Sequence, residues 1–141
     1  LGSGNWIVTK YQKADGTAIV VSSASKVIFA SRDTSLASGT QDITGFGFNP
    51  GACVVYLGIS VEVAGDNAAS WGVVASDASQ YCTYQLSNSV SILSEAVAFK
   101  YSNAGDRYTG TVSFITDGIR ITWVKLGTPT RIINLVVLGV K

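Results

Sequence analysis

The chain has 141 residues, 47% hydrophobic and 13% charged, which is the composition of one folded globular domain rather than of a disordered segment. It contains no histidine, so the commonest general base and the commonest metal ligand are both missing. Ten basic and nine acidic residues leave a net charge of +1, which gives no electrostatic footprint for nucleic acid or for an anionic membrane. Composition therefore favours a scaffold or binding module over an enzyme.

The longest apolar stretches, such as Ala52 to Leu57 and Leu135 to Leu138, are far shorter than the ~20 residues that cross a bilayer. Residues 1–4 lack the basic and hydrophobic regions of a secretory signal. Cys53 and Cys82 form no C-x-x-C pair, so we interpret them as small hydrophobic side chains in strands rather than as a disulfide, metal or redox pair. We expect a soluble protein without metal or cofactor.

The side chains favour strands, because valine and isoleucine, 17 and 11 residues, outnumber the 8 leucines and pack well on a pleated surface. Short apolar or alternating runs separated by Gly, Asn, Asp and Ser recur along the chain, and no window has a sustained helical stripe. We predict an all-β, jelly-roll-like sandwich of two antiparallel sheets, with about 10 strands in one domain over residues 1–141.

The predicted strands are Trp6 to Tyr11, Ala18 to Val21, Val27 to Phe29, Asp42 to Phe46, Ala52 to Val63, Ser70 to Val74, Gln80 to Leu86, Ala96 to Tyr101, Tyr108 to Thr116, Ile119 to Lys125 and Ile132 to Val140. Two serine-rich stretches, Ser31 to Thr40 and Ser87 to Ser94, lack strong periodicity and are predicted loops, the second with a helical turn near Ser91 to Glu95.

The clearest local signal is Asp117-Gly118, a dipeptide typical of two-residue hairpin turns. A turn centred on it places Thr116 opposite Ile119. The further pairs are Phe114 with Ile121 and Val112 with Trp123 on one face, and Ser113 with Thr122 on the other. This arrangement gathers the bulky side chains, apart from Ile115 and Val124, on one face, so we expect that face to line the core and to hold Trp123.

The run Ile132 to Val140 lacks alternation, which predicts a strand covered on both faces. One face would meet the core, and the other would meet another chain. Asn134 within this run is expected either to be hydrogen-bonded within the sheet or to mark the end of a sheet, because an unpaired buried amide costs about 1–3 kcal/mol.

Acidic pairs can hydrolyse glycosides without histidine, so we considered the acids. Glu62 and Asp66 flank a predicted strand end, whereas Asp33, Asp42, Asp77 and Glu95 lie in or beside predicted loops. Acids at turns ordinarily cap the backbone or face solvent, and none of these converge in the sequence. We therefore assign no catalytic residue, and a carboxylate-based glycosidase is the weakest hypothesis.

Two further motifs match known sites only superficially. Ser23-Ala24-Ser25-Lys26 fits the S-x-x-K pattern of acyl-transfer enzymes, but that pattern needs a helix and companion motifs that the chain lacks. The glycine-rich run Gly45 to Gly51 fits neither phosphate-binding fingerprint, and no lysine or helix follows it. We interpret these glycines as allowing a bulge or sharp bend at a strand end, followed by an Asn-Pro-Gly turn.

Aromatic side chains are the remaining route to a ligand, because exposed Trp and Tyr stack on sugars or anchor protein interfaces. The candidate ligand or interface residues are Trp71, Tyr81, Tyr84, Tyr101 and Tyr108. Tyr81 and Tyr84 are separated by an odd number of positions, so they must lie on opposite faces of a regular strand.

Four segments, taken in order, resemble a family of small structural proteins of tailed bacteriophages. The first is Ile43 to Tyr56, with a T-G-x-G-F-x-P-x-A opening and an apolar strand, and the others are Ser70 to Asp77, Phe114 to Trp123 and Leu135 to Gly139. In this order they span residues 43–139, about two-thirds of the chain. Ile119 stands where the family pattern has an aromatic residue, and residues 1–42 lie outside the resemblance, as an N-terminal arm or as extra strands.

The resemblance implies a non-enzymatic β-sandwich of the virion, assembled in the host cytoplasm, that decorates the capsid or forms part of the tail. Its expected partners are copies of itself and the major capsid or tail proteins, with neither nucleic acid nor a membrane. The low charge agrees with this role, because charged residues are depleted at interface cores. The alternative hypothesis is a carbohydrate-binding module or a host-receptor adhesin that uses the aromatic residues.

Overall fold

The computed structural model describes residues 11–12, 18–19, 24–59, 68–76, 79–86, 89–95, 98–103 and 106–141. These residues form strands, turns and bends, with no helix among them. The strands are β1 (Tyr11–Gln12), β2 (Ala18–Ile19), β3 (Ser25–Asp33), β4 (Gly39–Thr44), β5 (Ala52–Ile59), β6 (Ala68–Ser76), β7 (Ser79–Leu86), β8 (Ser89–Glu95), β9 (Phe99–Asn103), β10 (Asp106–Ile115), β11 (Gly118–Leu126) and β12 (Ile132–Val140).

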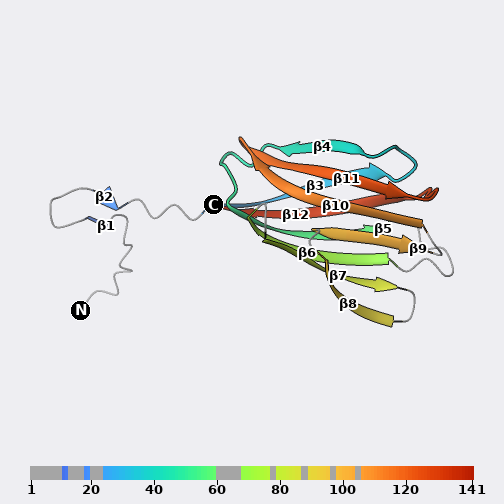
Figure 1. The fold of residues 1–141 in the computed structure, drawn as a ribbon. Helices are drawn as coiled ribbons and strands as arrows, with labels where there is room; N and C mark the ends of the chain where they lie inside the picture. The colour runs from blue at the N-terminus through green and yellow to red at the C-terminus, as the bar shows by residue number, and fades with distance from the viewer. Residues whose placement is uncertain are drawn as a thin grey trace, which may run out of the picture.

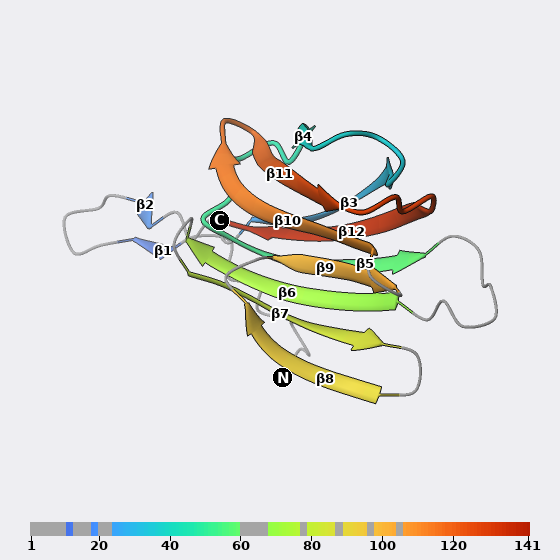
Figure 2. The ribbon, with the colours of Figure 1, turned by 45° about the vertical axis from the view of Figure 1, so that its right-hand side comes forward.

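Two sheets form the body of the protein (Figure 1). One has four strands in the order β4-β11-β10-β9, and the other has six in the order β3-β12-β5-β6-β7-β8 (Figure 2). Every pairing between neighbouring strands is antiparallel, and β1 and β2 form a separate two-stranded pair. The predicted all-β architecture of two antiparallel sheets is confirmed.

The wrapping of the chain is that of a jelly roll only in part. β3 pairs with β12 in the six-stranded sheet, and β4 pairs with β11 in the four-stranded sheet, as the outer strand pairs of a jelly roll do. β5 then pairs with β6 instead of β10, so β5 to β8 and β9 to β11 form two meanders. As a result β12 lies between β3 and β5, inside the larger sheet.

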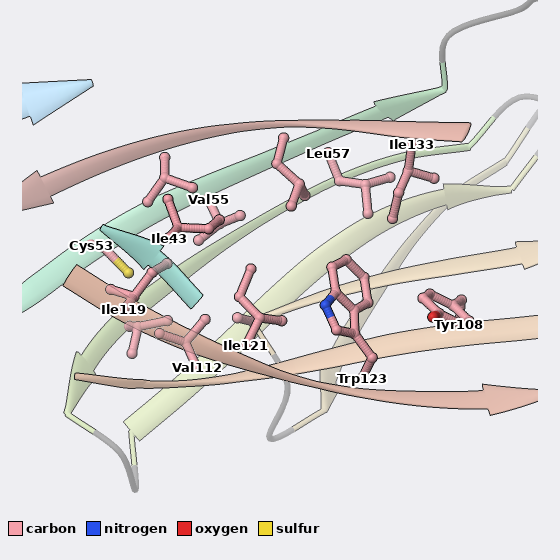
Figure 3. Close-up of a cluster of buried hydrophobic side chains, with 14 of the residues drawn as sticks. Ile43, Cys53, Val55, Leu57, Tyr108, Val112, Ile119, Ile121, Trp123 and Ile133 are labelled. Atoms are coloured by element: carbon pink, nitrogen blue, oxygen red, sulfur yellow. The ribbon is translucent and has the colours of Figure 1, made fainter. Parts of the chain in front are cut away.

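The core lies between the sheets (Figure 3). Aliphatic side chains of β5 and β12 face those of β10 and β11, because one set of alternate residues on each strand points inward. The largest fully buried side chains are those of Trp123, Tyr108, Leu57, Ile119, Ile121, Ile133, Leu135, Val55, Val74 and Val112. Each such aliphatic or aromatic side chain contributes about 1.5–3 kcal/mol through burial. The predicted core position of Trp123 is confirmed.

One end of the core is closed by an aromatic cluster. The rings of Tyr108 and Trp123 lie 5.0 Å apart, and the Arg32 guanidinium lies 5.6 Å from the centre of the Trp123 ring. Arg32 Nε also donates a hydrogen bond of 3.0 Å to the Tyr108 hydroxyl. These contacts join β3 to β10 and β11, and therefore link the two sheets.

The β10–β11 hairpin has the predicted faces but a different register. Ile115 pairs with Gly118, Phe114 with Ile119 and Val112 with Ile121, which differs from the predicted register by two residues. A slip of two residues keeps every side chain on its face, and the bulky residues do line the core. The turn is centred on Thr116 and Asp117, and Asp117 has a φ of 59°.

Contacts outside the hairpin explain the shift. Gly118 is the first residue of β11, and a Cβ there would lie 2.3 Å from the carbonyl oxygen of Ile43 in β4. Gly118 therefore provides a close approach between strands instead of a central turn residue. The carboxylate of Asp117 accepts hydrogen bonds from the backbone N–H groups of Gly45 and Gly47, and its own N–H donates to Asn49 Oδ1 at 2.9 Å.

The glycine-rich loop after β4 is built to make this contact. Gly45 and Gly47 have φ values of 98° and 78°, which other residues rarely adopt, so the predicted sharp bend is confirmed. The loop also cradles an anion, contrary to the interpretation of its glycines as bends alone: the anion is the Asp117 carboxylate. Phe46, from the same loop, fills the space above Gly139 in β12, where a Cβ would lie 2.4 Å from the ring. The glycine-rich loop, the tip of the β10–β11 hairpin and β12 are thus in contact.

The structure corrects the two predicted serine-rich loops. Ser89–Glu95 is strand β8 at the edge of the six-stranded sheet, without a helical turn. The first loop is shorter than predicted, because β3 extends to Asp33 and β4 begins at Gly39. Residues 25–42 therefore contribute strands to the sandwich. Most of the strand predicted over Trp6 to Tyr11, and the part of Ala52 to Val63 that follows Ile59, lie outside the described residues.

A buried glutamine joins the sheets at the edge of β10. β9 begins at Phe99, which pairs with Gly110, so within the described ranges no strand pairs with Val112 of β10 on that side. The Gln80 amide of β7 replaces the missing strand: its Nε2 donates to the Val112 carbonyl at 2.6 Å, and its Oε1 accepts from the Val112 N–H at 2.7 Å. Gln80 is 5% exposed, so both hydrogen bonds are shielded from water.

We predict that Gln80→Met lowers the free energy of unfolding by about 2–4 kcal/mol, because the thioether fills the space but leaves two buried backbone groups without partners. Urea denaturation followed by circular dichroism measures the change. Thr122→Met is the control, because Thr122 is exposed on the outside of β11 and should change stability by less than about 0.5 kcal/mol. Equal midpoints for Gln80→Met and the wild type would contradict this role.

Candidate interaction surface

The outer side of the six-stranded sheet carries two complete rows of mostly apolar side chains. The strand register places Phe29, Val136, Tyr56, Trp71 and Thr83 side by side across β3, β12, β5, β6 and β7. The row two residues away contains Val27, Leu138, Val54, Val73 and Tyr81 on the same five strands. We call these ten residues the apolar face.

The apolar face is open to solvent. Phe29 is 77% exposed, Trp71 63%, Tyr81 61% and Val73 55%, and Val27, Val54 and Tyr56 are each at least 40% exposed. Single exposed apolar residues are common on proteins, but a contiguous patch is typical of a binding surface. In planar projection two rows over five strands cover about 320 Å², the size of the largest patch on a typical monomer.

On the strands of the large sheet, both sets of alternate side chains are apolar. One set fills the core, and the other set forms the apolar face. In β12, Ile133, Leu135 and Val137 are buried in the core, whereas Val136 and Leu138 point outward and are half-buried. The predicted strand without alternation is therefore confirmed, but the described residues of the chain cover only one of its faces. Asn134 lies on the exposed side between Ser31 and Gly58, so its amide is not a buried group.

The apolar face and its surroundings carry almost no charge. Among the described outward side chains of β3, β12, β5, β6 and β7, Asp33 at the end of β3 is the single ionisable acid or base other than tyrosine. Small or uncharged polar residues border the rows, including Ser25, Ser31 and Asn134. An apolar centre with an uncharged polar border resembles the anatomy of a protein interface.

The outer side of the four-stranded sheet is different. An ion pair joins β11 to the edge strand β4 there: Arg120 Nε and Nη2 donate to the two carboxylate oxygens of Asp42 at 2.7 and 2.8 Å. The hydrogen bonds from Arg120 hold the pKa of Asp42 below its ordinary value, and the same pairing raises the pKa of Arg120. Thr40, Thr111 and Thr122 surround the pair. Val124 and Leu126 are also exposed on this side, but their partners on β10 are Thr109 and Arg107, so they form no apolar row across the sheet. This side therefore resembles an ordinary solvated sheet face.

The structure divides the five aromatic candidates. Trp71 and Tyr81 lie on neighbouring strands of the apolar face, as an interaction site requires. Tyr84 and Tyr108 are wrong as surface candidates, because they are 6% and 0% exposed and point into the core. The predicted opposite orientation of Tyr81 and Tyr84 is confirmed. Tyr101 belongs to β9, and its side chain lies outside the described residues.

Sequence reasoning missed Phe29 and Tyr56, which complete the aromatic part of the apolar face. The sequence could have indicated Tyr56, because Val54-Val55-Tyr56-Leu57 is a run of apolar residues without alternation, like the β12 segment. Such a run places apolar side chains on both faces of a strand. Phe29 stands on β3 at the edge of the sheet, where no local pattern distinguishes an outward aromatic residue from a core one.

The acids whose side chains are described have structural partners. Asp33 accepts a hydrogen bond from the Ser35 N–H at 2.8 Å, and hydrogen bonds from Ser35 lower its pKa. Asp106 accepts from the Thr128 N–H at 2.7 Å, and Asp117 binds the glycine loop. Within the described ranges, no three residues of the His, Cys, Asp and Glu types gather as a metal site. Glu62, Asp66 and Asp77 fall outside the described residues.

A shallow hollow of about 500 Å³ lies near the tip of the β10–β11 hairpin. It is lined by Asn49, Pro50, Phe114, Ile115 and Thr116, none of which has an ionisable side chain. The residues that line the hollow therefore supply no general acid or base.

Comparisons with protein-family models, curated proteins and solved structures give no match for this chain. In the described part of the chain, no helix is long and apolar enough to cross a membrane.

The two cysteines are buried in the sandwich and form no disulfide with each other, as expected of small hydrophobic residues. Burial raises the pKa of the Cys53 thiol to about 12. We predict that Cys53 and Cys82 react negligibly with Ellman's reagent at pH 8 in the folded protein, because the reactive species is an accessible thiolate. Both should react in denaturant, where thiols have a pKa of about 8.5. Rapid reaction of a thiol in the native protein would contradict the buried placement.

Proposed function

We propose that this chain is a non-enzymatic structural protein that assembles into a larger particle through its apolar face. The observation that supports this proposal is the exposed double row of apolar side chains on one sheet. Among the described residues, the outer side of the other sheet holds an ion pair and has no such double row. Burying apolar area drives association at roughly 25 cal/mol per Å², so such a face favours contact with another protein surface over water. One outer side would then dock while the other remains in solvent.

We propose further that the particle is the virion of a tailed bacteriophage, with the chain on the capsid surface or in the tail. The resemblance in residues 43–56, 114–123 and 135–139 supports this assignment, because these segments meet around Asp117, Phe46 and Gly139. They form a structural framework that positions β4, β5, β11 and β12.

We predict that purified virions of the phage that encodes the chain contain it in stoichiometric copies. Val73→Lys should reduce its incorporation at least tenfold, because a lysine at the centre of the apolar face would be buried without a partner. Val124→Lys is the matched control: Val124 is 51% exposed, close to the 55% of Val73, but lies on the outer side of the four-stranded sheet. Quantitative mass spectrometry of gradient-purified particles measures incorporation. Virions without the chain would disprove the virion assignment.

A carbohydrate-binding or receptor-binding role is the second candidate, favoured by the flat arrangement of Tyr56, Trp71 and Tyr81 on adjacent strands. Aromatic faces stack on sugar rings, but a sugar site also needs polar groups for the hydroxyls. The positions between these aromatic residues are occupied by Val54, Val73 and Thr83, which offer a single hydroxyl. Assembly therefore accounts better for the whole face.

This second role makes its own prediction. A glycan array would show specific binding by the wild type, and Trp71→Ala would weaken that binding at least tenfold, because stacking on the indole is lost. Val124→Ala serves as a control on the opposite side of the sandwich. An array without signal, together with virion incorporation, would leave assembly as the function.

A further inference from the structure

We infer that the occupant of the apolar face is a second copy of this chain, packed face to face through the six-stranded sheet. This inference rests on the proposed assembly function and names the partner for that surface. Two copies would be related by a two-fold axis that lies between the sheets and runs across the strands, between the two rows of the apolar face. Each strand would then lie over its own symmetry mate.

The area is sufficient for a stable contact. Five strands spaced ~4.8 Å apart, over about 27 Å of strand length, present about 650 Å² in planar projection. Two copies would bury about 1,300 Å², which lies within the ~1,200–2,000 Å² of specific protein interfaces. The strip includes the apolar face and the bordering rows with Ser25, Ser31 and Asn134.

The charge distribution favours a copy over a charged partner. A face without lysine, arginine or glutamate among its described residues cannot attract nucleic acid or anionic lipid. Against a second copy the same neutrality is an advantage, because no like charges meet and no unpaired charge is buried. Asp33 lies at the end of its strand, away from the two rows.

The side-chain sizes are complementary under this symmetry. On each of four strands the outward pair consists of one aromatic and one β-branched residue: Val27 and Phe29, Val54 and Tyr56, Val73 and Trp71, Thr83 and Tyr81. The axis exchanges the two rows, so every aromatic ring meets a smaller side chain of the second copy. Packed sheets cross at about 30°, so this match is closest at the central strands, where Tyr56 would meet Val54 of the second copy.

The test is the mass of the full chain in solution, measured by sedimentation equilibrium from about 1 to 100 µM. We expect the wild type and Val124→Lys to approach twice the 14.7 kDa of one chain. Val73→Lys and Trp71→Glu should each raise the dissociation constant at least about a hundredfold, because each buries an unpaired charge. At a concentration low enough for the wild type to be monomeric, all variants should have the same denaturation midpoint as the wild type, because the substituted positions are exposed and no association contributes to stability.

Mixing the Trp71→Glu and Val73→Lys chains tests the axis. The two new charges would face each other across it, so a mixed dimer should form although neither variant dimerises alone. Absence of the mixed dimer overturns this arrangement.

A monomeric wild type at 100 µM overturns the inference, as does equal weakening by Val124→Lys and Val73→Lys. A chain that stays monomeric but enters virions overturns the inference of a second copy and leaves the proposed function intact. A monomer that floats with phosphatidylcholine vesicles overturns the inference too. A dimer that is absent from virions would overturn the virion assignment alone.

Discussion

A β-strand sends successive side chains to opposite faces, and the central strands of the large sheet are apolar at both parities. One set of side chains, including Val55, Leu57 and Leu135, closes the core against the smaller sheet. The other set, including Tyr56 and Val136, has no layer over it among the described residues. Because apolar area in water is unfavourable, this double use of the strands supports the proposal that the sandwich packs against another protein layer.

The smaller sheet carries charged side chains that are paired on its outer side and at its hairpin tip. Asp42 and Arg120 pair on its outer side, and Asp117 is held by the glycine loop at the hairpin tip. This loop also brings together three segments that are widely separated in the sequence. The T-G-F-G-F segment supplies N–H groups and the Phe46 ring, the hairpin supplies a carboxylate, and β12 supplies a glycine that leaves room for the ring.

Side-chain periodicity was enough to predict the fold class, the core face of the hairpin and the full extent of β12, because these depend on local patterns. The hairpin register was missed because Gly118 is required by β4, a contact that no local pattern reveals. β8 was missed because its alternation is weak in a serine-rich segment. Trp71 and Tyr81 were identified as surface candidates, but only strand order brings Phe29 and Tyr56 beside them.

The position of β12 inside the large sheet also has a consequence for biosynthesis. Ser25 of β3 pairs with Val140, and Ala52 of β5 pairs with the same residue, so neither neighbour completes its hydrogen bonding until the 132–140 segment inserts between them. Pairing over so long a sequence separation is slow. The five-strand width of the apolar face, which crosses β3, β12 and β5, is therefore completed only when the 132–140 segment of the nascent chain has been made and has folded into place.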